Sequence, residues 1–367
     1  MFKMIKNMDR RIKIYLGTAA GTILLLIFLL IILKISVGVR ITSKKFETRL
    51  KDAAVNYYKK EKKKLPKVDG EQITITIDDL VTEGYLKDPD KLLKKNVTCT
   101  GGVNVSNNNG YYLYQPVIDC SDGYKTNLLY KKILEDNPTK TSGDGLYKIN
   151  DYYLFRGENL NNYVQFAGKN WQILRINSDN TIRIILIDSL EAVPWDNRYN
   201  IEKKDSAGKN DFEVSRIKQT LIDYFSNKKG KLFTKDDKAL MVPTQLCIGS
   251  KNELSEAMDG AIECSKKSEK LPIGLLQVNE YPIVSLDKDC KKLYDSSCRN
   301  YNFLAKLYTF WTITADSKST YEVYKIDSGV DSVIASTYSQ PRMVINITSD
   351  ALYKNGKGTS DNPYIIK

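Results

Sequence analysis

The chain has 367 residues, with 56 Lys and Arg against 44 Asp and Glu, which gives a net charge of +12. It contains no histidine, which excludes Ser-His-Asp and Cys-His catalysis and every metal site that needs a histidine ligand. Two common nucleotide-binding patterns, G-x-x-x-x-G-K-[ST] and G-x-G-x-x-G after a strand, are also missing.

Residues 14–33, IYLGTAAGTILLLIFLLIIL, carry no charged side chain. A helix of about 20 apolar residues matches the roughly 30 Å hydrocarbon core of a bilayer. We therefore expect residues 14–37 to be an uncleaved transmembrane signal anchor behind a basic cytoplasmic segment, residues 1–13. A cleaved signal peptide is the alternative, but its apolar region is shorter and ends in an A-x-A-like cleavage site, which we do not find in residues 34–39.

Cysteine usage indicates on which side of the membrane the bulk of the chain lies, because Lys and Arg flank both ends of the anchor. An even number of cysteines, all after the anchor, is typical of disulfides in an oxidising compartment. We predict a cytoplasmic N-terminus, an extracytoplasmic part over residues 40–367, and pairing within modules. Six reduced thiols in a cytosolic protein are the alternative. The expected pairs are Cys99 with Cys120, Cys247 with Cys264, and Cys290 with Cys298.

Residues 40–134 form the first extracytoplasmic module that we predict. Apolar residues at spacings of three and four predict a helix over 43–64, and the alternation at 73–77 predicts a strand. Asp78 is the expected cap of a short helix. Strands over 97–105 and 111–119 would be joined by a turn at 106–110.

This module resembles type IV pilins and pseudopilins. The resemblance rests on A-A-x-x-Y-Y at 53–58, L-P at 65–66 and T-x-x-x-L-x-x-x-G-Y-L at 76–86, and it covers about residues 14–126. It implies a small α+β module behind a membrane helix. The pilin processing site Gly-Phe-Thr-Leu-x-Glu is absent, so we expect an anchored stalk and not a fibre subunit.

Residues 135–146 are polar and rich in Pro, Gly, Ser and Thr, which predicts a linker. Beyond it, we expect a larger α+β domain over 147–367, with short strands and a helix over 214–225 that Asn210 or Asp211 would cap. The strands are predicted at 152–156, 163–166, 171–176, 181–187, 241–248, 311–315, 321–326, 343–347 and 364–366.

The distal domain resembles an uncharacterised bacterial family that is similar in layout to C-type-lectin-like domains and formylglycine-generating enzymes. The matching runs are 171–176, 184–188, 210–218, 341–346 and 356–364. The resemblance implies that the first and last strands of the domain meet, so 364–366 would pair near its start. It also makes Trp195, Asp196 and Asn197 a candidate ligand-binding loop, similar to the W-N-D motif of calcium- and sugar-binding lectins; a simple loop aromatic is the alternative.

Two classes of function follow from these observations. The first is a surface protein with a binding or adhesion head for an unknown extracellular ligand, a glycan or a protein. The second is an extracytoplasmic hydrolase that uses paired carboxylates, for which Asp188, Glu191 and Asp196 are close in sequence. A pseudopilin-like part of a secretion or DNA-uptake machine is a third, weaker option. We assign no catalytic, cofactor-binding or metal-ligating residue, and we expect the membrane but no nucleic acid as a partner.

Overall fold

The computed structural model describes residues 40–251 and 264–366, which form two compact units. The described part of unit 1 comprises 40–59, 76–103 and 116–125. Unit 2 comprises 60–75, 104–115 and the described residues from 126 onward. Both contain helices and strands, so the predicted α+β class is confirmed.

The predicted membrane anchor, residues 14–37, and the basic segment before it lie outside the described residues. Within 40–251 and 264–366, no helix combines the length and the apolar character needed to cross a bilayer. The anchor therefore stays a prediction.

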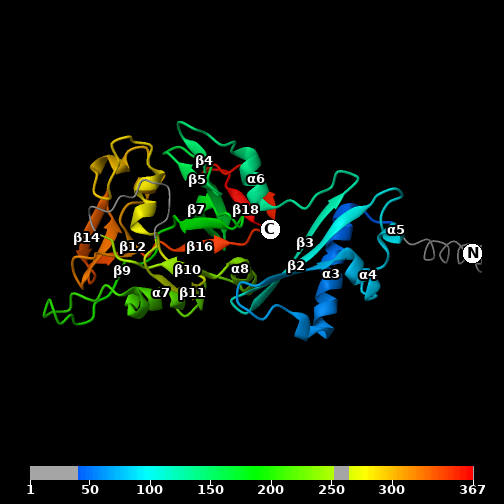
Figure 1. The fold of residues 1–367 in the computed structure, drawn as a ribbon, viewed down its shortest axis with the longest axis horizontal. Coiled ribbons are helices and arrows are strands. Elements are labelled where there is room, and N and C mark those ends of the chain that lie inside the picture. Colours follow the sequence, from blue (N-terminus) through cyan, green and yellow to red (C-terminus); the bar gives the residue numbers. More distant parts are fainter. Residues whose placement is uncertain (1–39, 252–263, 367) are drawn as a thin grey trace, which may run out of the picture. The chain divides into compact units, whose positions relative to one another are not determined.

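Unit 1 is built around helix α3 (Ser43–Lys60), which lies against the unit 1 part of the neighbouring strands (Figure 1). Its predicted apolar stripe is buried, including Phe46 and Leu50. The Tyr124 hydroxyl donates to Glu47 Oε2 at 2.9 Å, which ties the helix to the end of the sheet. The helix is shorter than predicted, because clustered lysines repel one another at its end and Pro66 follows. Lys62–Lys64 form a separate 3₁₀ turn, η1.

Three strands, β1 (Gln72–Thr76), β2 (Cys99–Asn108) and β3 (Tyr111–Cys120), form a sheet in the order β1-β2-β3. Two short helices, α4 (Ile77–Thr82) and α5 (Pro89–Leu92), follow β1. Thr76 caps α4, and its hydroxyl accepts from the Asp79 backbone N–H at 3.1 Å. The cap is thus Thr76 and not Asp78, because Thr76 forms a reciprocal pair with the third helical residue.

The hairpin between β2 and β3 is tighter than the predicted five-residue turn. It has two residues, Asn109 and Gly110, with φ of 57° and 77°, as a type I′ turn requires. The polar residues before the turn extend the strand. They belong to unit 2, and other residues of the same unit bind their side chains. Asn108 Nδ2 donates to the Ala239 carbonyl at 2.7 Å, and Asn109 Nδ2 donates to the Met241 carbonyl at 2.8 Å.

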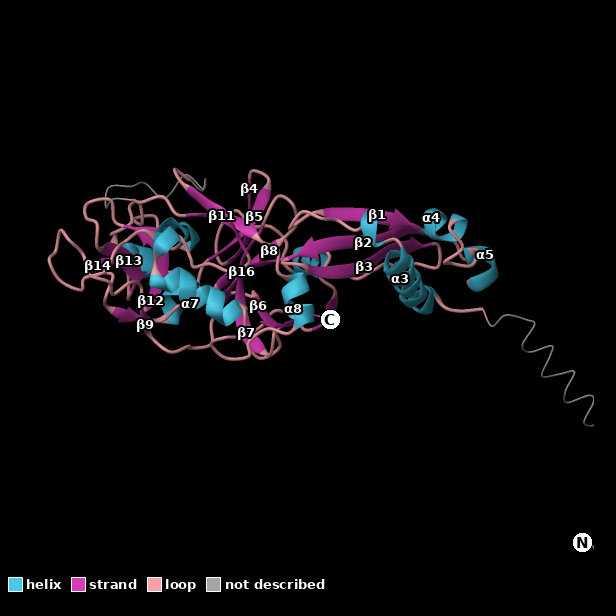
Figure 2. Cartoon of the chain, turned by 90° about the horizontal axis from the view of Figure 1, so that it is seen from below, coloured by secondary structure: helices cyan, strands magenta, loops and turns pink. Residues whose placement is uncertain are grey.

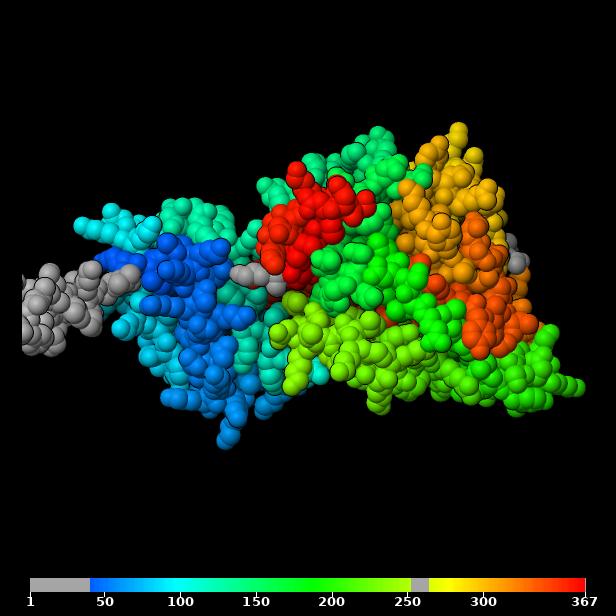
Figure 3. Space-filling view, turned by 180° about the vertical axis from the view of Figure 1, so that it is seen from behind, coloured from blue at the N-terminus to red at the C-terminus, as the bar shows by residue number. Residues whose placement is uncertain are grey.

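Unit 2 is centred on an eight-stranded sheet in the order β16-β8-β7-β6-β18-β17, with β5 pairing both β4 and β7. β18 pairs in parallel with β6, with Tyr364 opposite Val164, so the C-terminal strand pairs near the start of the segment 147–367, as expected. Figure 3 shows the C-terminal segment, in red, beside residues coloured green. The strands are β4 (Gly145–Ile149), β5 (Tyr152–Arg156), β6 (Tyr163–Phe166), β7 (Lys169–Ile176), β8 (Ile182–Leu186), β16 (Val344–Ile347), β17 (Tyr353–Asn355) and β18 (Tyr364–Ile366).

Smaller sheets and helices complete unit 2. The sheets pair β9 (Val193–Pro194) with β15 (Tyr338–Ser339), β10 (Thr244–Cys247) with β11 (Lys267–Leu271), and β12 (Phe310–Ala315) with β13 (Glu322–Ile326), which also pairs β14 (Val330–Ile334). The helices are α6 (Leu129–Asp136), α7 (Arg216–Phe225) and α8 (Lys235–Leu240). The 3₁₀ turns are η2 (Phe212–Val214), η3 (Val278–Glu280), η4 (Pro282–Val284), η5 (Ser296–Arg299) and η6 (Phe303–Leu307).

Helix α7 lies beside β9 and buries Ile217 and Leu221 in the core (Figure 2). Its cap is Ser215, whose Oγ accepts from the Lys218 backbone N–H at 3.2 Å. The predicted cap Asp211 instead begins the separate turn η2. The helix therefore starts later than predicted.

The segment predicted as a linker, residues 135–146, lies inside unit 2. Helix α6 buries Leu129 and Ile133 in the core of this unit. After the helix, Asn137 Nδ2 donates to the Tyr364 hydroxyl at 3.1 Å. The Lys140 N–H donates to the Leu146 carbonyl at 2.8 Å. The division between units falls before α6, since the apolar face of this helix needs the core of unit 2.

Candidate functional site

A β-bulge in the central sheet of unit 2 places two arginines opposite each other. On β7 and β8, Ile173 faces Ile184 and the next aligned pair is Arg175 with Arg183, so Leu174 is the extra residue. Without the bulge, alternation would turn Arg175 to the other face of the sheet. Like charges directly opposite each other destabilise a strand pair, so this arrangement needs a counter-charge.

Glu280, at the end of η3, supplies that counter-charge. Its carboxylate accepts from Arg183 Nε at 2.7 Å and from Arg183 Nη2 at 2.8 Å, and it lies 3.5 Å from Arg175 Nη1. The Gln277 backbone N–H also donates to Glu280 Oε2 at 2.9 Å. Because Glu280 is only 4% exposed, this is a buried ionic cluster.

The cluster has one positive charge in excess, since two guanidinium groups share one carboxylate. Burial by itself raises the pKa of Glu280, but Arg183 and Arg175 outweigh burial and hold the pKa below its ordinary value. Burial lowers the pKa of Arg175 to about 10, although Glu280 opposes this shift. At neutral pH all three groups are therefore ionised, and the net charge is +1.

A cavity of about 200 Å³ adjoins the cluster. Its lining combines cationic and amide groups with apolar ones, and it includes the Cys247–Cys264 disulfide. Arg175 Nη1 and Gln277 Oε1 are buried without a hydrogen-bond partner, and both residues line the cavity. The lining residues are Arg175, Arg183, Gln245, Leu246, Cys247, Cys264, Lys267, Leu275, Gln277, Glu280 and Ile313.

This arrangement suits the binding of an anion. Arginine keeps its charge and presents fixed donors that match carboxylate and phosphate oxygens. Exposed Lys267 adds a third cation beside the cavity. Among the residues that the structure describes, no group of three or more Cys, Asp and Glu side chains is placed to hold a metal ion.

The candidate loop Trp195, Asp196 and Asn197 is occupied by contacts within the fold. Trp195 is 0% exposed, and its Nε1 donates to the Thr312 carbonyl at 3.0 Å. Asp196 is also 0% exposed and accepts from Arg198 Nε at 2.9 Å. Asn197 is half-buried, and its Oδ1 has no hydrogen-bond partner. The first two side chains have no surface to offer a ligand, so our proposals do not rest on this loop.

The three carboxylates proposed for hydrolysis have separate partners. Asp188 lies 3.9 Å from Lys169 Nζ, and Glu191 lies 3.4 Å from Lys229 Nζ. Asp196 is bound to Arg198. Each of the three carboxylates thus forms an ion pair with a different cationic residue.

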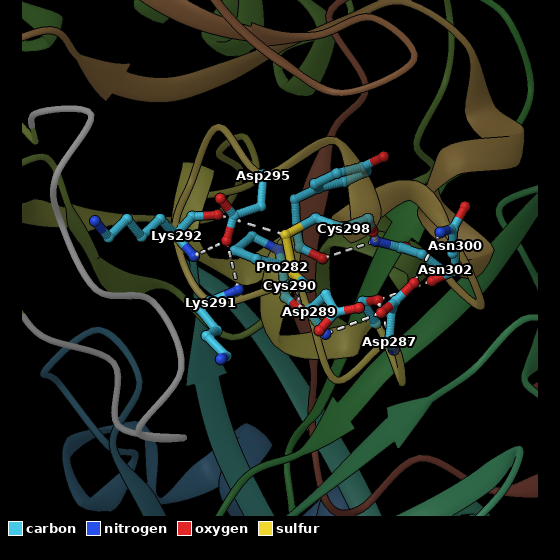
Figure 4. The surroundings of a disulfide bond; sticks show 12 residues. Pro282, Asp287, Asp289, Cys290, Lys291, Lys292, Asp295, Cys298, Asn300 and Asn302 are labelled. Carbon is cyan, nitrogen blue, oxygen red and sulfur yellow. Dashed lines mark hydrogen bonds between the residues drawn. A yellow bond between two sulfur atoms is a disulfide. The ribbon is translucent and has the colours of Figure 1, made fainter.

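The structure contains three disulfides, Cys99–Cys120, Cys247–Cys264 and Cys290–Cys298, which are the pairs expected from the sequence. The first links the start of β2 to the end of β3. The third closes a loop that is rich in polar contacts (Figure 4). In this loop Asp295 Oδ2 accepts from the backbone N–H groups of Lys291 and Lys292, both at 2.7 Å.

A second hollow, about 680 Å³, lies next to this disulfide loop. Three of its four charged side chains have a partner nearby: Lys306 Nζ is 3.2 Å from Glu158, and Asn300 Nδ2 donates to Asp287 at 2.8 Å. None of its lining residues, all of which the structure describes, holds a buried polar atom without a partner. The arginine cavity is therefore the stronger candidate site. The lining residues of the hollow are Glu158, Asp287, Arg299, Asn300, Tyr301, Asn302, Ala305, Lys306 and Ser328.

The sequence does carry a signal for the arginine cavity. Arg175 and Arg183 each interrupt a run of apolar residues in a predicted strand. A charged residue in a buried strand needs a partner of opposite charge, so the pattern predicts a buried ion pair at these positions. Glu280 has no comparable signal, because it lies in a loop-rich region outside every predicted strand.

Comparison of the chain with models of protein families, with curated proteins and with solved structures finds no match. Function must therefore be derived from the residues and geometry of this chain.

Proposed function

We propose that the chain is a membrane-anchored bacterial surface protein whose unit 2 binds a small anionic ligand in the arginine cavity. The observation that carries this proposal is the pairing of Arg175 with Arg183 across two strands, with Glu280 as their shared counter-charge. A bound anion would balance the remaining charge of the cluster. Bulges occur often beside functional sites, where they re-aim a side chain.

The extracytoplasmic location is supported by two features. The uncharged stretch 14–33 has the length of a membrane span. The three disulfides are typical of an oxidising compartment. In the arrangement that we propose, the N-terminus is cytoplasmic, a pilin-like stalk follows the anchor, and a C-type-lectin-like head carries the cavity.

Binding is favoured over catalysis by the chemistry of the cavity. Its cationic groups are arginines and a lysine, which hold an anion firmly but serve poorly as proton acceptors at neutral pH. The chain also has no histidine to act as a general base. Turnover of a surface polysaccharide that is abolished by substituting Asp188, Glu191 or Asp196 would favour the hydrolase instead.

Thermal unfolding of the full chain in detergent micelles tests the ligand proposal. Sodium acetate, glucuronate, sulfate and phosphate are each compared with sodium chloride at equal ionic strength. We expect a saturable rise in melting temperature with at least one anion, because a ligand that binds only the folded state stabilises it. Arg175→Met should remove the rise, whereas Arg299→Met, which changes an exposed arginine outside the cavity, should keep it. Equal responses to all salts in all three proteins would refute an anion site.

Protease treatment of intact cells that express the chain tests the location. We expect cleavage within residues 40–367 and protection of residues 1–13. Protection of the bulk of the chain, with cleavage only near the N-terminus, would show that the orientation is the reverse.

A further inference from the structure

Two buried polar atoms without a hydrogen-bond partner, one a donor and one an acceptor, belong to residues that line the arginine cavity. Arg175 Nη1 can only donate a hydrogen bond, and Gln277 Oε1 can only accept one. Gln277 is 7% exposed, and its amide nitrogen already donates to the Cys247 carbonyl at 3.4 Å. Arg175 Nη1 has only the ion pair with Glu280, at 3.5 Å, and no hydrogen bond. Buried polar atoms without a hydrogen-bond partner are rare in folded proteins, so these two atoms favour a ligand with both an acceptor and a donor.

The charge of the site limits the ligand further. The cluster of Arg175, Arg183 and Glu280 has a net charge of +1, which one negative charge neutralises. A dianion would leave an excess negative charge beside the buried carboxylate of Glu280, because Lys267 is exposed and solvent screens its charge. A ligand that donates through an ammonium group would instead add a cation next to two arginines. A neutral hydroxyl is the donor that fits both limits.

The walls of the cavity favour an organic ligand. Leu246, Leu275 and Ile313 are buried residues of the lining and offer apolar contact. The volume of about 200 Å³ equals that of about seven water molecules in the liquid. This is more than an inorganic anion fills, and it is enough for one small ring or a short chain.

We infer that the ligand of this cavity is a hydroxycarboxylate, a compact organic monoanion with a hydroxyl group close to its carboxylate. This inference rests on the proposed anion-binding function and names its ligand class. The carboxylate would bind at Arg175, and the hydroxyl would donate to Gln277 Oε1. A free hydroxy acid and an acidic sugar unit of a glycan share this chemistry.

Three matched probes separate the two contacts in titration calorimetry on the full chain. Glucuronate has the ring, the carboxylate and the hydroxyls; cyclohexanecarboxylate lacks the hydroxyls, and glucose lacks the carboxylate. We expect glucuronate to bind at least about tenfold more tightly than either analogue, because each analogue leaves one buried polar group unpaired. This comparison needs only the unaltered protein.

Variants then assign each contact to its residue. Gln277→Met keeps the backbone bond to Glu280 but removes the acceptor, so glucuronate affinity should fall about tenfold while cyclohexanecarboxylate affinity stays unchanged. Arg175→Met should weaken both ligands. Gln219→Met, at an exposed position on α7, is the matched control and should change neither. Free glucuronate and an oligosaccharide that ends in glucuronate are then compared on the full chain. The tighter of the two ligands shows whether the site takes a free acid or the end of a glycan.

Two outcomes would overturn the inference and leave the anion site standing. One is equal binding of glucuronate and cyclohexanecarboxylate, and the other is tighter binding of inorganic phosphate than of glucuronate. Absence of Arg175-dependent binding for every anion, including sulfate and phosphate, would overturn the proposed function and the inference together.

Discussion

Replacement of Glu280 by leucine is the most direct test of the buried cluster. It leaves Arg175 and Arg183 facing each other across the strands without a counter-charge. It also removes three hydrogen bonds to the carboxylate, two from Arg183 and one from the Gln277 backbone. Breaking a buried ion pair by removing one partner costs about 3–5 kcal/mol, so we expect unit 2 to lose about 4 kcal/mol of unfolding free energy.

Tryptophan fluorescence during urea unfolding of the full chain is a suitable assay. The three tryptophans, Trp171, Trp195 and Trp311, all lie in unit 2 and are at most 1% exposed, so the signal reports this unit. Arg175→Met is the matched control. It relieves the repulsion with Arg183 and leaves the Arg183–Glu280 pair intact, so we expect a change within about 1 kcal/mol.

The pH dependence gives a second readout of the same change. Because the pKa of Glu280 is lowered in the folded state, its stabilising effect is complete above its ordinary value of 4.5 and is lost as the pH falls through the lowered pKa. The difference between the unaltered protein and Glu280→Leu should therefore narrow on the acid side of pH 4.5. A loss below about 1 kcal/mol at neutral pH would refute the view that Glu280 neutralises buried arginines.

Three further predictions test other parts of the molecule. The double variant Cys99→Ser and Cys120→Ser should lower the unfolding free energy of unit 1 by about 3 kcal/mol, because the disulfide closes a loop over a sequence separation of 21. Hydrogen exchange of the backbone amides of β2 and β3 measures this loss, and unchanged protection would contradict it. Tyr281→Phe should stabilise unit 2 by about 1 kcal/mol, because the buried hydroxyl has no partner and burial raises its pKa to about 12; a lower urea midpoint would show that the hydroxyl is bonded. Burial raises the pKa of Asp350, although Asn104 Nδ2 donates to its carboxyl group at 2.9 Å. The protonated Asp350 side chain therefore stabilises the folded protein at low pH, and this stabilisation is lost as the pH rises through the raised pKa. The unfolding free energy of Asp350→Asn, relative to that of the unaltered protein, should therefore be higher at pH 7 than at pH 4. The same difference in unfolding free energy at both pH values would contradict the raised pKa of Asp350.

Local patterns in the sequence predict much of unit 2 and the strand-linking disulfide of unit 1. The runs at 152–156 and 163–166 have the same bounds in the structure, because β-branched and aromatic residues between turn residues favour short strands. The nearest cysteines along the chain are also paired, since short loops bring their ends together at low entropic cost.

Tertiary structure decides the features that carry the proposals. A bulge at Leu174 sets which face of the sheet Arg175 occupies, and no local pattern distinguishes a bulge from regular alternation. The Glu280 partner is almost 100 residues away from Arg183, so only the folded chain shows that the charge is shared. Trp195 likewise looks like a loop aromatic, yet the structure buries it completely. Composition and spacing act over a few residues, whereas burial and charge pairing depend on which distant segments meet.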